Sequence, residues 1–306
     1  MTSPSVPSEA APGSLDDPRL ITPMMLRAWP LPEPAGTKYS RGQVVVVGGA
    51  RSTPGAAMLA GVAALRVGAG RLTLAVAQSV AAMVAVSVPE SGVVGLPEDA
   101  SGSVNGQDAG SLLEREVGRA DALLVGPGLD DADGTRLLLE QMLAVAPSTL
   151  PILLDAYGAT VVSSLGADAL DRLAGRVVMT PNEAELAYVV GQDDLDEDDV
   201  LAAAQEVAHR HRAVVACQGH VFNPQGVWRV STGDTGLGTS GSGDVLAGAI
   251  SGLLSRGASR EQACVWGVHA HAAAGDALAA RLGRVGYLAG ELLPELPLVL
   301  GSLRGD

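Results

Sequence analysis

The chain has 306 residues, of which 47% are hydrophobic and 3% aromatic, and its formal net charge is −14. This length suffices for one large domain or two small ones, with a core built mainly from Ala, Val and Leu. The strong negative charge argues against nucleic acids and anionic membranes as partners. A phosphorylated small molecule is still compatible with it, because a local site can override the global sign.

The two cysteines, Cys217 and Cys264, are far apart in the sequence, and no cluster of Cys and His has the spacing of a metal site. We therefore expect buried, reduced thiols and a cytoplasmic location. The sequence contains no uninterrupted run of about 18 apolar residues, so it predicts no transmembrane helix. The first 38 residues lack the apolar segment of a secretory signal.

Residues 1–38 contain eight prolines and little hydrophobic periodicity. This composition predicts an N-terminal tail that is flexible or loosely draped over the body, within which residues 21–29 could form a short docked helix. Residues 39–306 are expected to form a single catalytic domain, because neither an internal repeat nor a change of composition marks a second one.

Short apolar runs alternate with helical patterns over the rest of the chain. Strands are predicted at residues 44–47, 72–76, 122–125, 152–154, 177–179 and 213–216, with two further extended runs at 221–222 and 227–230, and helices at 55–67, 134–145, 245–256 and 259–281. This alternation predicts a three-layer α/β fold with a mainly parallel central sheet.

Glycine turns or polar residues follow five of the predicted strands, at residues 48–49, 126–128, 155, 180–185 and 218–219. In sheets of this kind, ligands bind beyond the carboxyl ends of the strands. We therefore expect these five segments to converge on one functional site.

The most informative segment is Gly241-Ser242-Gly243-Asp244, which leads into an apolar helical pattern. The glycines let the backbone approach a ligand, and the N–H groups of a first helical turn attract an anion. A carboxylate repels phosphate, so we interpret Asp244 as a general base for a substrate hydroxyl. The N–H groups of Ser242 to Asp244 would hold the charge of a transferred phosphoryl group. The alternative is a structural acid that complements the helix dipole.

Other candidate residues each have a structural alternative. Asp155 could bind Mg²⁺ or position a water, or be an ordinary turn residue at a strand end. Asn182 and Glu185 could act on a ligand or form a turn before a helix. His269 and His271 lie two apart, on different helix faces, which favours packing over metal binding. The acidic residues 193–199 are better explained as the start of a helix than as a cation site.

Six segments, at residues 55–70, 88–90, 126–129, 154–156, 180–186 and 241–248, occur in a familiar order. Together they resemble the ADP/ATP-dependent NAD(P)H-hydrate dehydratases, which are carbohydrate-kinase-like enzymes of the ribokinase-like fold. The resemblance implies repair of NADH or NADPH whose nicotinamide ring has been hydrated (NADHX or NADPHX). Asp244 would deprotonate the ring hydroxyl, which is then phosphorylated, and phosphate would leave with help from the ring nitrogen.

The resemblance also implies partners and site residues. It implies ADP or ATP as co-substrate with Mg²⁺, a cytoplasmic homotetramer, and a separate NAD(P)HX epimerase as functional partner. It assigns Asp244 to catalysis, Gln218, Gly219, His220, Val221, Phe222 and Gly243 to nucleotide binding, and Ala56, Gly128 and Asn182 to substrate binding. The residue patterns described above add Ser242 to the nucleotide-binding set and Glu185 and Asp155 to the substrate-binding set. No residue is assigned to a protein-bound metal.

Several positions depart from the family's pattern, among them Tyr157, Ala184 and Ser240, and two departures bear directly on the proposed site. Gln218 stands where the family usually has Lys, and Asn182 stands where it has His. A neutral amide offers a phosphate less charge than an ammonium group. Two alternatives therefore stay open: a kinase for a vitamin precursor, favoured by the Thr-Pro-Asn-x-x-Glu pattern at residues 180–185, and a catalytically weakened nucleotide-binding relative.

Overall fold

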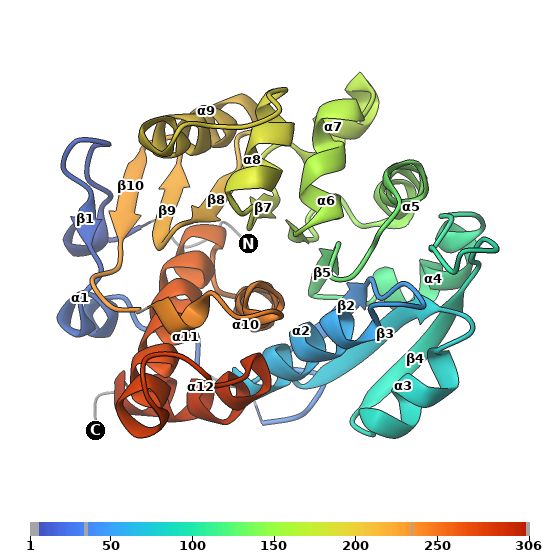
Figure 1. Ribbon diagram of the computed structural model, residues 1–306, viewed down its shortest axis with the longest axis horizontal. Helices are drawn as coiled ribbons and strands as arrows, with labels where there is room; N and C mark the ends of the chain where they lie inside the picture. Colours follow the sequence, from blue (N-terminus) through green and yellow to red (C-terminus); the bar gives the residue numbers. More distant parts are fainter. Residues whose placement is uncertain (1–5, 34–35, 234, 304–306) are drawn as a thin grey trace.

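The computed structural model describes residues 6–33, 36–233 and 235–303, and its centre is a ten-stranded sheet (Figure 1). The strands are β1 (Arg19–Leu20), β2 (Gln43–Val47), β3 (Arg71–Ala77), β4 (Ser91–Leu96), β5 (Ala122–Val125), β6 (Ile152–Leu154), β7 (Val177–Met179), β8 (Val214–Cys217), β9 (His220–Asn223) and β10 (Gly226–Arg229). Their order is β1-β10-β9-β8-β7-β6-β5-β2-β3-β4. Every neighbouring pair is parallel except the two that involve β9.

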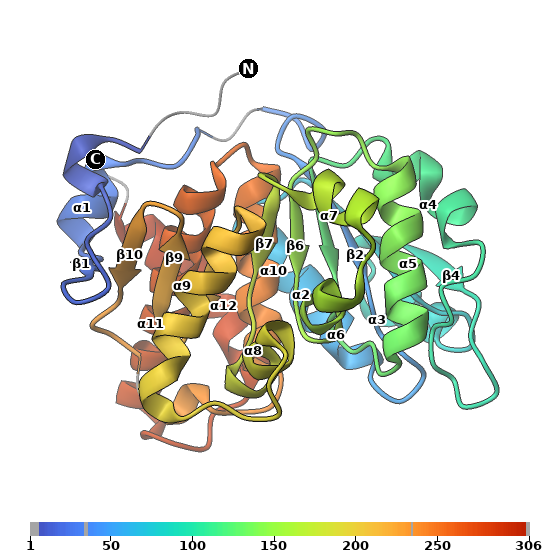
Figure 2. The same cartoon turned by 90° about the horizontal axis from the view of Figure 1, so that it is seen from above.

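Helices cover both faces of this sheet (Figure 2). They are α1 (Pro23–Ala28), α2 (Pro54–Arg66), α3 (Ala81–Ser87), α4 (Ala109–Val117), α5 (Ala132–Val145), α6 (Tyr157–Thr160), α7 (Ala167–Leu173), α8 (Glu183–Val190), α9 (Val200–His211), α10 (Ser242–Ser255), α11 (Arg260–Leu282) and α12 (Ala289–Leu303). One layer holds α5, α7, α8 and α9, and the other holds α2, α10, α11 and α12. The predicted three-layer α/β fold is therefore confirmed. None of the described helices is long and apolar enough to cross a membrane.

The central strands are buried on both faces. Every residue of β5, β6, β7 and β8 is buried. Parallel strands between two helical layers need apolar side chains on both sides, which explains why these strands are continuous apolar runs. The strands predicted at residues 122–125, 152–154 and 177–179 coincide with β5, β6 and β7.

Helices α2 and α10 approach each other closely through small residues. A Cβ atom on Gly248 would lie 2.0 Å from the carbonyl oxygen of Ala60, and one on Gly252 would lie 2.6 Å from that of Ala64. Only glycine permits so close an approach. The contact fixes α10 in the second layer and thereby sets the position of its first turn, which contains Asp244.

The N-terminal segment differs from the predicted tail. Over residues 6–33 it packs on the body: β1 extends the sheet beside β10, and the indole N–H of Trp228 donates to the carbonyl of Ala10 over 2.8 Å. Helix α1 buries Met25 and Leu26, in agreement with the short docked helix expected over residues 21–29. The prediction of a flexible tail is wrong for residues 6–33, because a few apolar side chains and backbone hydrogen bonds suffice to dock a proline-rich segment. Residues 1–5 and 34–35 lie outside the described residues.

Candidate active site

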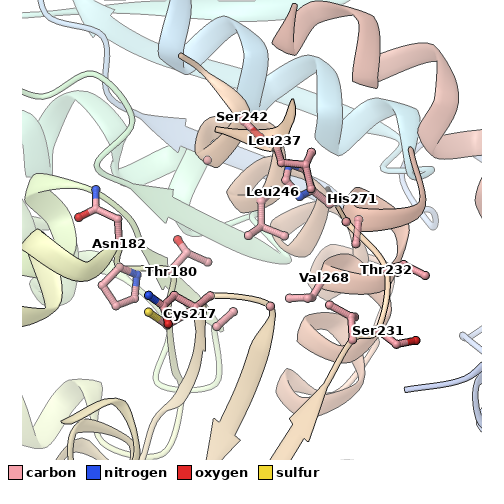
Figure 3. Close-up of a pocket in the computed structure, with 18 residues that line it drawn as sticks. Thr180, Asn182, Cys217, Ser231, Thr232, Leu237, Ser242, Leu246, Val268 and His271 are labelled. Atoms are coloured by element: carbon pink, nitrogen blue, oxygen red, sulfur yellow. Dashed lines mark hydrogen bonds between the residues drawn. The ribbon is translucent and has the colours of Figure 1, made fainter. Parts of the chain in front are cut away.

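A cavity of about 630 Å³ lies at the carboxyl ends of the strands (Figure 3). Its wall is formed by the segments after β7, β8 and β10, by the first turn of α10 and by the middle of α11. The residues that the structure describes in this wall include no Lys or Arg. Any phosphate bound here must therefore be met by neutral donors, such as backbone N–H groups, hydroxyl groups, side-chain amides or an imidazole, or by an accompanying cation.

A tight turn between β8 and β9 brings Gln218 and Gly219 to the cavity. Both residues have a positive φ, 46° for Gln218 and 71° for Gly219, as a two-residue hairpin turn of the primed type requires. Nε2 of Gln218 donates to Oε1 of Glu183 at the start of α8. The side chain at the position of the family's Lys is thus tied to an acidic residue.

The first turn of α10 faces the same cavity. The N–H of Ser242 donates to the carbonyl of Thr239 over 3.1 Å, so it is not free for a ligand, contrary to the expectation for this group. The N–H groups of Gly243 and Asp244 have no hydrogen-bond partner among the described residues. A Cβ atom on Gly243 would meet nothing within 4 Å. Open space therefore lies next to two free donors at a helix N-terminus, where an anion is favoured.

Three carboxyl groups from separate elements influence one another at this edge of the sheet. Burial and the nearby carboxylate of Glu185 raise the pKa of Asp244 to about 6. Burial raises the pKa of Asp155 to about 8, with help from Glu185 and Asp244 and against the hydrogen bond from the Thr180 hydroxyl, 2.6 Å long. Burial also raises the pKa of Glu185. A carboxylate with a pKa near 6 is a better proton acceptor near neutral pH than an ordinary one.

Asn182 and Glu185 form a capping box at the N-terminus of α8. The Asn182 side chain accepts from the N–H of Glu185 over 2.9 Å, and the Glu185 carboxylate accepts from the N–H of Asn182 over 3.0 Å. The helix-capping role that the sequence left open is therefore present. Asn182 also lines the larger cavity, and both residues line a second cavity of about 560 Å³ together with Tyr157 and Tyr188.

Ala56 and Gly128 lie next to each other beyond the ends of β2 and β5. A Cβ atom on Gly128 would be 3.0 Å from the Cβ atom of Ala56, and the Thr53 hydroxyl donates to the carbonyl of Gly128 over 2.8 Å. Gly128 has a φ of 72°, which favours glycine. Neither Ala56 nor Gly128 is among the residues that line the two cavities.

The structure does not bring the whole predicted nucleotide-binding segment to the cavity. Val221 and Phe222 on β9 are fully buried in the core. His220 stacks on Phe222 with ring centroids 5.9 Å apart, and its Nδ1 lies 2.9 Å from the carbonyl oxygen of Gln218. From residues 218–222, only Gln218 and Gly219 line the cavity.

Sequence reasoning missed one part of the wall. His271 of α11 lines the cavity, where its Nε2 lies 2.9 Å from the Ser242 hydroxyl, and Thr232 and Cys217 are further lining residues. Burial and the carboxylates of Glu183 and Glu185 raise the pKa of the Cys217 thiol to about 12, so it stays protonated. Burial of a helical histidine is common, and only the fold brings His271 to the turn that contains Asp244. Among the described residues, no group of three His, Cys, Asp or Glu could hold a metal ion by itself.

Comparison of the sequence with known proteins identifies the family of this chain. Residues 44–298 match the model of the NAD(P)H-hydrate dehydratases. The chain belongs to this family. It is 41% identical over 291 residues to the ADP-dependent (S)-NAD(P)H-hydrate dehydratase of Xanthomonas campestris pv. campestris, a match that covers 93% of the chain and 97% of the relative. The resemblance inferred from the sequence motifs is therefore confirmed.

Two further relatives bear on the fold and the domain organisation. The bifunctional NAD(P)H-hydrate repair enzyme Nnr of Moorella thermoacetica is 35% identical over 304 residues, which cover 94% of the chain but only 55% of that relative. The ADP/ATP-dependent NAD(P)H-hydrate dehydratase of Bacillus subtilis, co-crystallised with ATP and Mg²⁺, superposes with a TM-score of 0.77 at 25% identity and covers 94% of the chain and 99% of that structure. The matched region thus covers nearly the whole length of two relatives and about half of the bifunctional one.

Proposed function

We propose that this protein dehydrates NADHX or NADPHX and regenerates the reduced cofactor at the expense of ADP or ATP. The observation that supports this most directly is Asp244, a carboxyl with a pKa raised to about 6, in the first turn of a helix whose adjacent residues Ser242 and Gly243 line a cavity. Family membership supplies the substrate class.

The reaction divides into two steps. Asp244 takes the proton of the ring hydroxyl, whose oxygen then bonds to the terminal phosphorus of the nucleotide as the bond to the leaving nucleotide oxygen breaks. In the second step the ring nitrogen donates its lone pair, the carbon–oxygen bond breaks, and phosphate leaves. Loss of a proton from the neighbouring carbon restores NADH or NADPH. The N–H groups of Gly243 and Asp244, which have no partner among the described residues, would stabilise the charge on the transferred phosphoryl group.

The donor set fits a magnesium ion that arrives with the nucleotide. Mg²⁺ is commonly held by one or two carboxylates together with substrate phosphates and waters. Neither Asp155 nor Glu185 lines the larger cavity, although Glu185 lines the second one, and the described part of the larger cavity's wall has no cationic side chain to neutralise a polyphosphate. Asp155, whose raised pKa keeps it protonated near neutral pH, would have to lose its proton to bind the ion. When bound, the ion would supply charge neutralisation of the phosphates. Asp155 and Glu185 are the residues that would hold it.

Finer aspects follow the relatives. We propose ADP as the preferred co-substrate, as in the name of the Xanthomonas campestris relative. A separate NAD(P)HX epimerase is proposed as functional partner, because the bifunctional repair enzymes are almost twice the length of the matched region. The cytoplasmic location rests on two buried, free cysteines. A homotetramer stays a prediction from the family resemblance.

The decisive assay supplies NADHX with Mg²⁺ and either ADP or ATP, and follows the return of NADH by its absorbance. We expect recovery that depends on the nucleotide and that is faster with ADP. The proposal fails if NADHX persists while the protein transfers phosphate to a pyrimidine or thiazole alcohol, which would favour the vitamin-precursor kinase. Binding of nucleotide without either reaction would favour a catalytically weakened relative.

A further inference from the structure

A buried hydrogen bond joins α10 and α11 at the wall of the larger cavity (Figure 3). Ser242 is the first residue of α10 and His271 lies in the middle of α11, and Ser242 Oγ is 2.9 Å from His271 Nε2. Ser242 is 4% exposed and His271 is 8% exposed, yet both line the cavity. Packing therefore holds the pair in one place while it faces the proposed nucleotide site.

The hydroxyl is the only donor that Ser242 can offer to a ligand. Its backbone N–H already donates to the carbonyl of Thr239. The next two residues, Gly243 and Asp244, provide backbone N–H groups without a partner among the described residues. A correctly oriented Ser242 hydroxyl would thus be a third donor in the same helical turn.

The orientation of that hydroxyl depends on His271. Burial lowers the pKa of His271 to about 4, so the ring is neutral near pH 7 and carries one N–H. If the hydroxyl donates to Nε2, its single proton is consumed and its lone pairs face the cavity, where they repel phosphate oxygen. If Nε2–H donates to the hydroxyl oxygen, the hydroxyl proton is free to donate into the cavity.

We propose that His271 is a positioning residue for the nucleotide: it donates through Nε2–H to Ser242, and the Ser242 hydroxyl in turn donates to a nucleotide phosphate. This inference rests on the proposed use of a nucleotide and not on the dehydration step. Hydrogen bonds to charged groups are stronger than neutral ones, so losing the phosphate contact should weaken binding about tenfold.

The test measures the affinity for ADP with Mg²⁺ by calorimetry in the wild type, S242A, H271L, H271Q and the double variant S242A/H271L. H271Q keeps an N–H donor in a similar position, and S242A removes only one heavy atom at the cavity wall. Both substitutions are therefore small enough for the protein to fold normally. The matched control is H269L. His269 lies on the same helix, is 6% exposed and does not line the cavity.

We expect S242A and H271L each to weaken ADP binding about tenfold, and the double variant to be no weaker than either single variant, because both remove the same contact. H271Q should bind ADP within about threefold of the wild type, and H269L should bind it normally even if its Tm falls. An unchanged affinity in S242A, or losses that multiply in the double variant, would overturn the proposal. A wild type that binds ADP without restoring NADH would refute the dehydratase function and leave this inference standing.

Discussion

Gln218, in the turn between β8 and β9, donates through its side-chain amide to the carboxylate of Glu183 at the start of α8. The family usually has Lys at this position. Gln218 lines the proposed nucleotide cavity. In this chain the carboxylate of Glu183 therefore accepts a hydrogen bond from a neutral amide instead of pairing with the ammonium group of a lysine. The cavity wall then lacks the positive charge that a lysine would bring.

Replacing Gln218 with Lys should tighten ADP binding. The ammonium group would add a positive charge near the phosphates, but Glu183 would compete for it, so we expect a gain of only about threefold. Removing the competitor in Q218K/E183Q should increase the gain to about tenfold. Calorimetric titration at low and high salt checks both values, since the added attraction should shrink with ionic strength.

The E183Q single variant is the control for that series. It removes an acid near the cavity without adding a cation, so its effect on affinity isolates the loss of repulsion. An affinity for ADP that is unchanged or weaker in both Q218K and Q218K/E183Q would show that residue 218 does not face the phosphates.

The activity should depend on ionisation of Asp244. Because the pKa of this carboxyl is raised to about 6, the base is ionised above pH 6 and protonated below it. We expect kcat/KM to fall about tenfold for each pH unit below 6. Asp244→Asn should bind ADP but lose turnover by at least about a thousandfold. Retained turnover in this variant would remove Asp244 from the role of base.

The middle of the sheet could be predicted from the sequence, but its edge could not. Strands β5 and β6 are short apolar runs flanked by Asp, Gly or Pro, and β7 is a similar run between Arg176 and Thr180. Because strands that are buried on both faces need continuous apolar runs, all three could be predicted from the sequence. Strand β4 lies at the sheet edge, is mostly half-buried and contains two glycines, so the sequence pattern does not indicate a strand there. Helix α12 contains Pro294 and Pro297, which normally indicate a helix end.

The same distinction applies to the site. The parallel topology places the strand ends together, so the convergence of Asp155, Thr180 and Gln218 follows from the order of the strands. The contacts that orient individual groups do not follow from any local pattern. Ser242 and His271 are 29 residues apart, and Gln218 and Glu183 are 35 apart, and neither separation corresponds to a helical or strand repeat.

Asp155 should limit the stability of the folded protein at alkaline pH. Its pKa is raised from 3.8 to about 8, so the folded state holds the proton more tightly than the unfolded state. The contribution of Asp155 to the stability is therefore greatest below about pH 4 and decreases as the pH rises toward 8. Asp155→Asn removes the buried charge while it keeps an acceptor for Thr180, and we expect it to be more stable by about 1–3 kcal/mol at pH 8.5.

Urea denaturation of Asp155→Asn and the wild type at pH 5 and pH 8.5 provides the internal control. At pH 5 the wild-type carboxyl is protonated in the folded state, so the two proteins should differ by less than about 1 kcal/mol. An equal difference at both pH values would mean that the substitution acts through packing and that the Asp155 charge has no part in it.

Gly243 offers a way to separate nucleotide binding from folding. A Cβ atom at this position meets no protein atom within 4 Å, so Gly243→Ala should fold normally and gain up to about 1 kcal/mol from the higher helix propensity of Ala. The added methyl group would occupy the open space beside the free N–H groups of the first turn.

Gly290, near the start of α12, is equally unobstructed and exposed, so Gly290→Ala is the matched control. We expect Gly243→Ala to weaken ADP binding at least about tenfold, a loss of about 1.4 kcal/mol, while Gly290→Ala binds normally. Equal ADP affinity in the two variants, measured by calorimetry alongside their Tm values, would place the phosphates away from the first turn of α10.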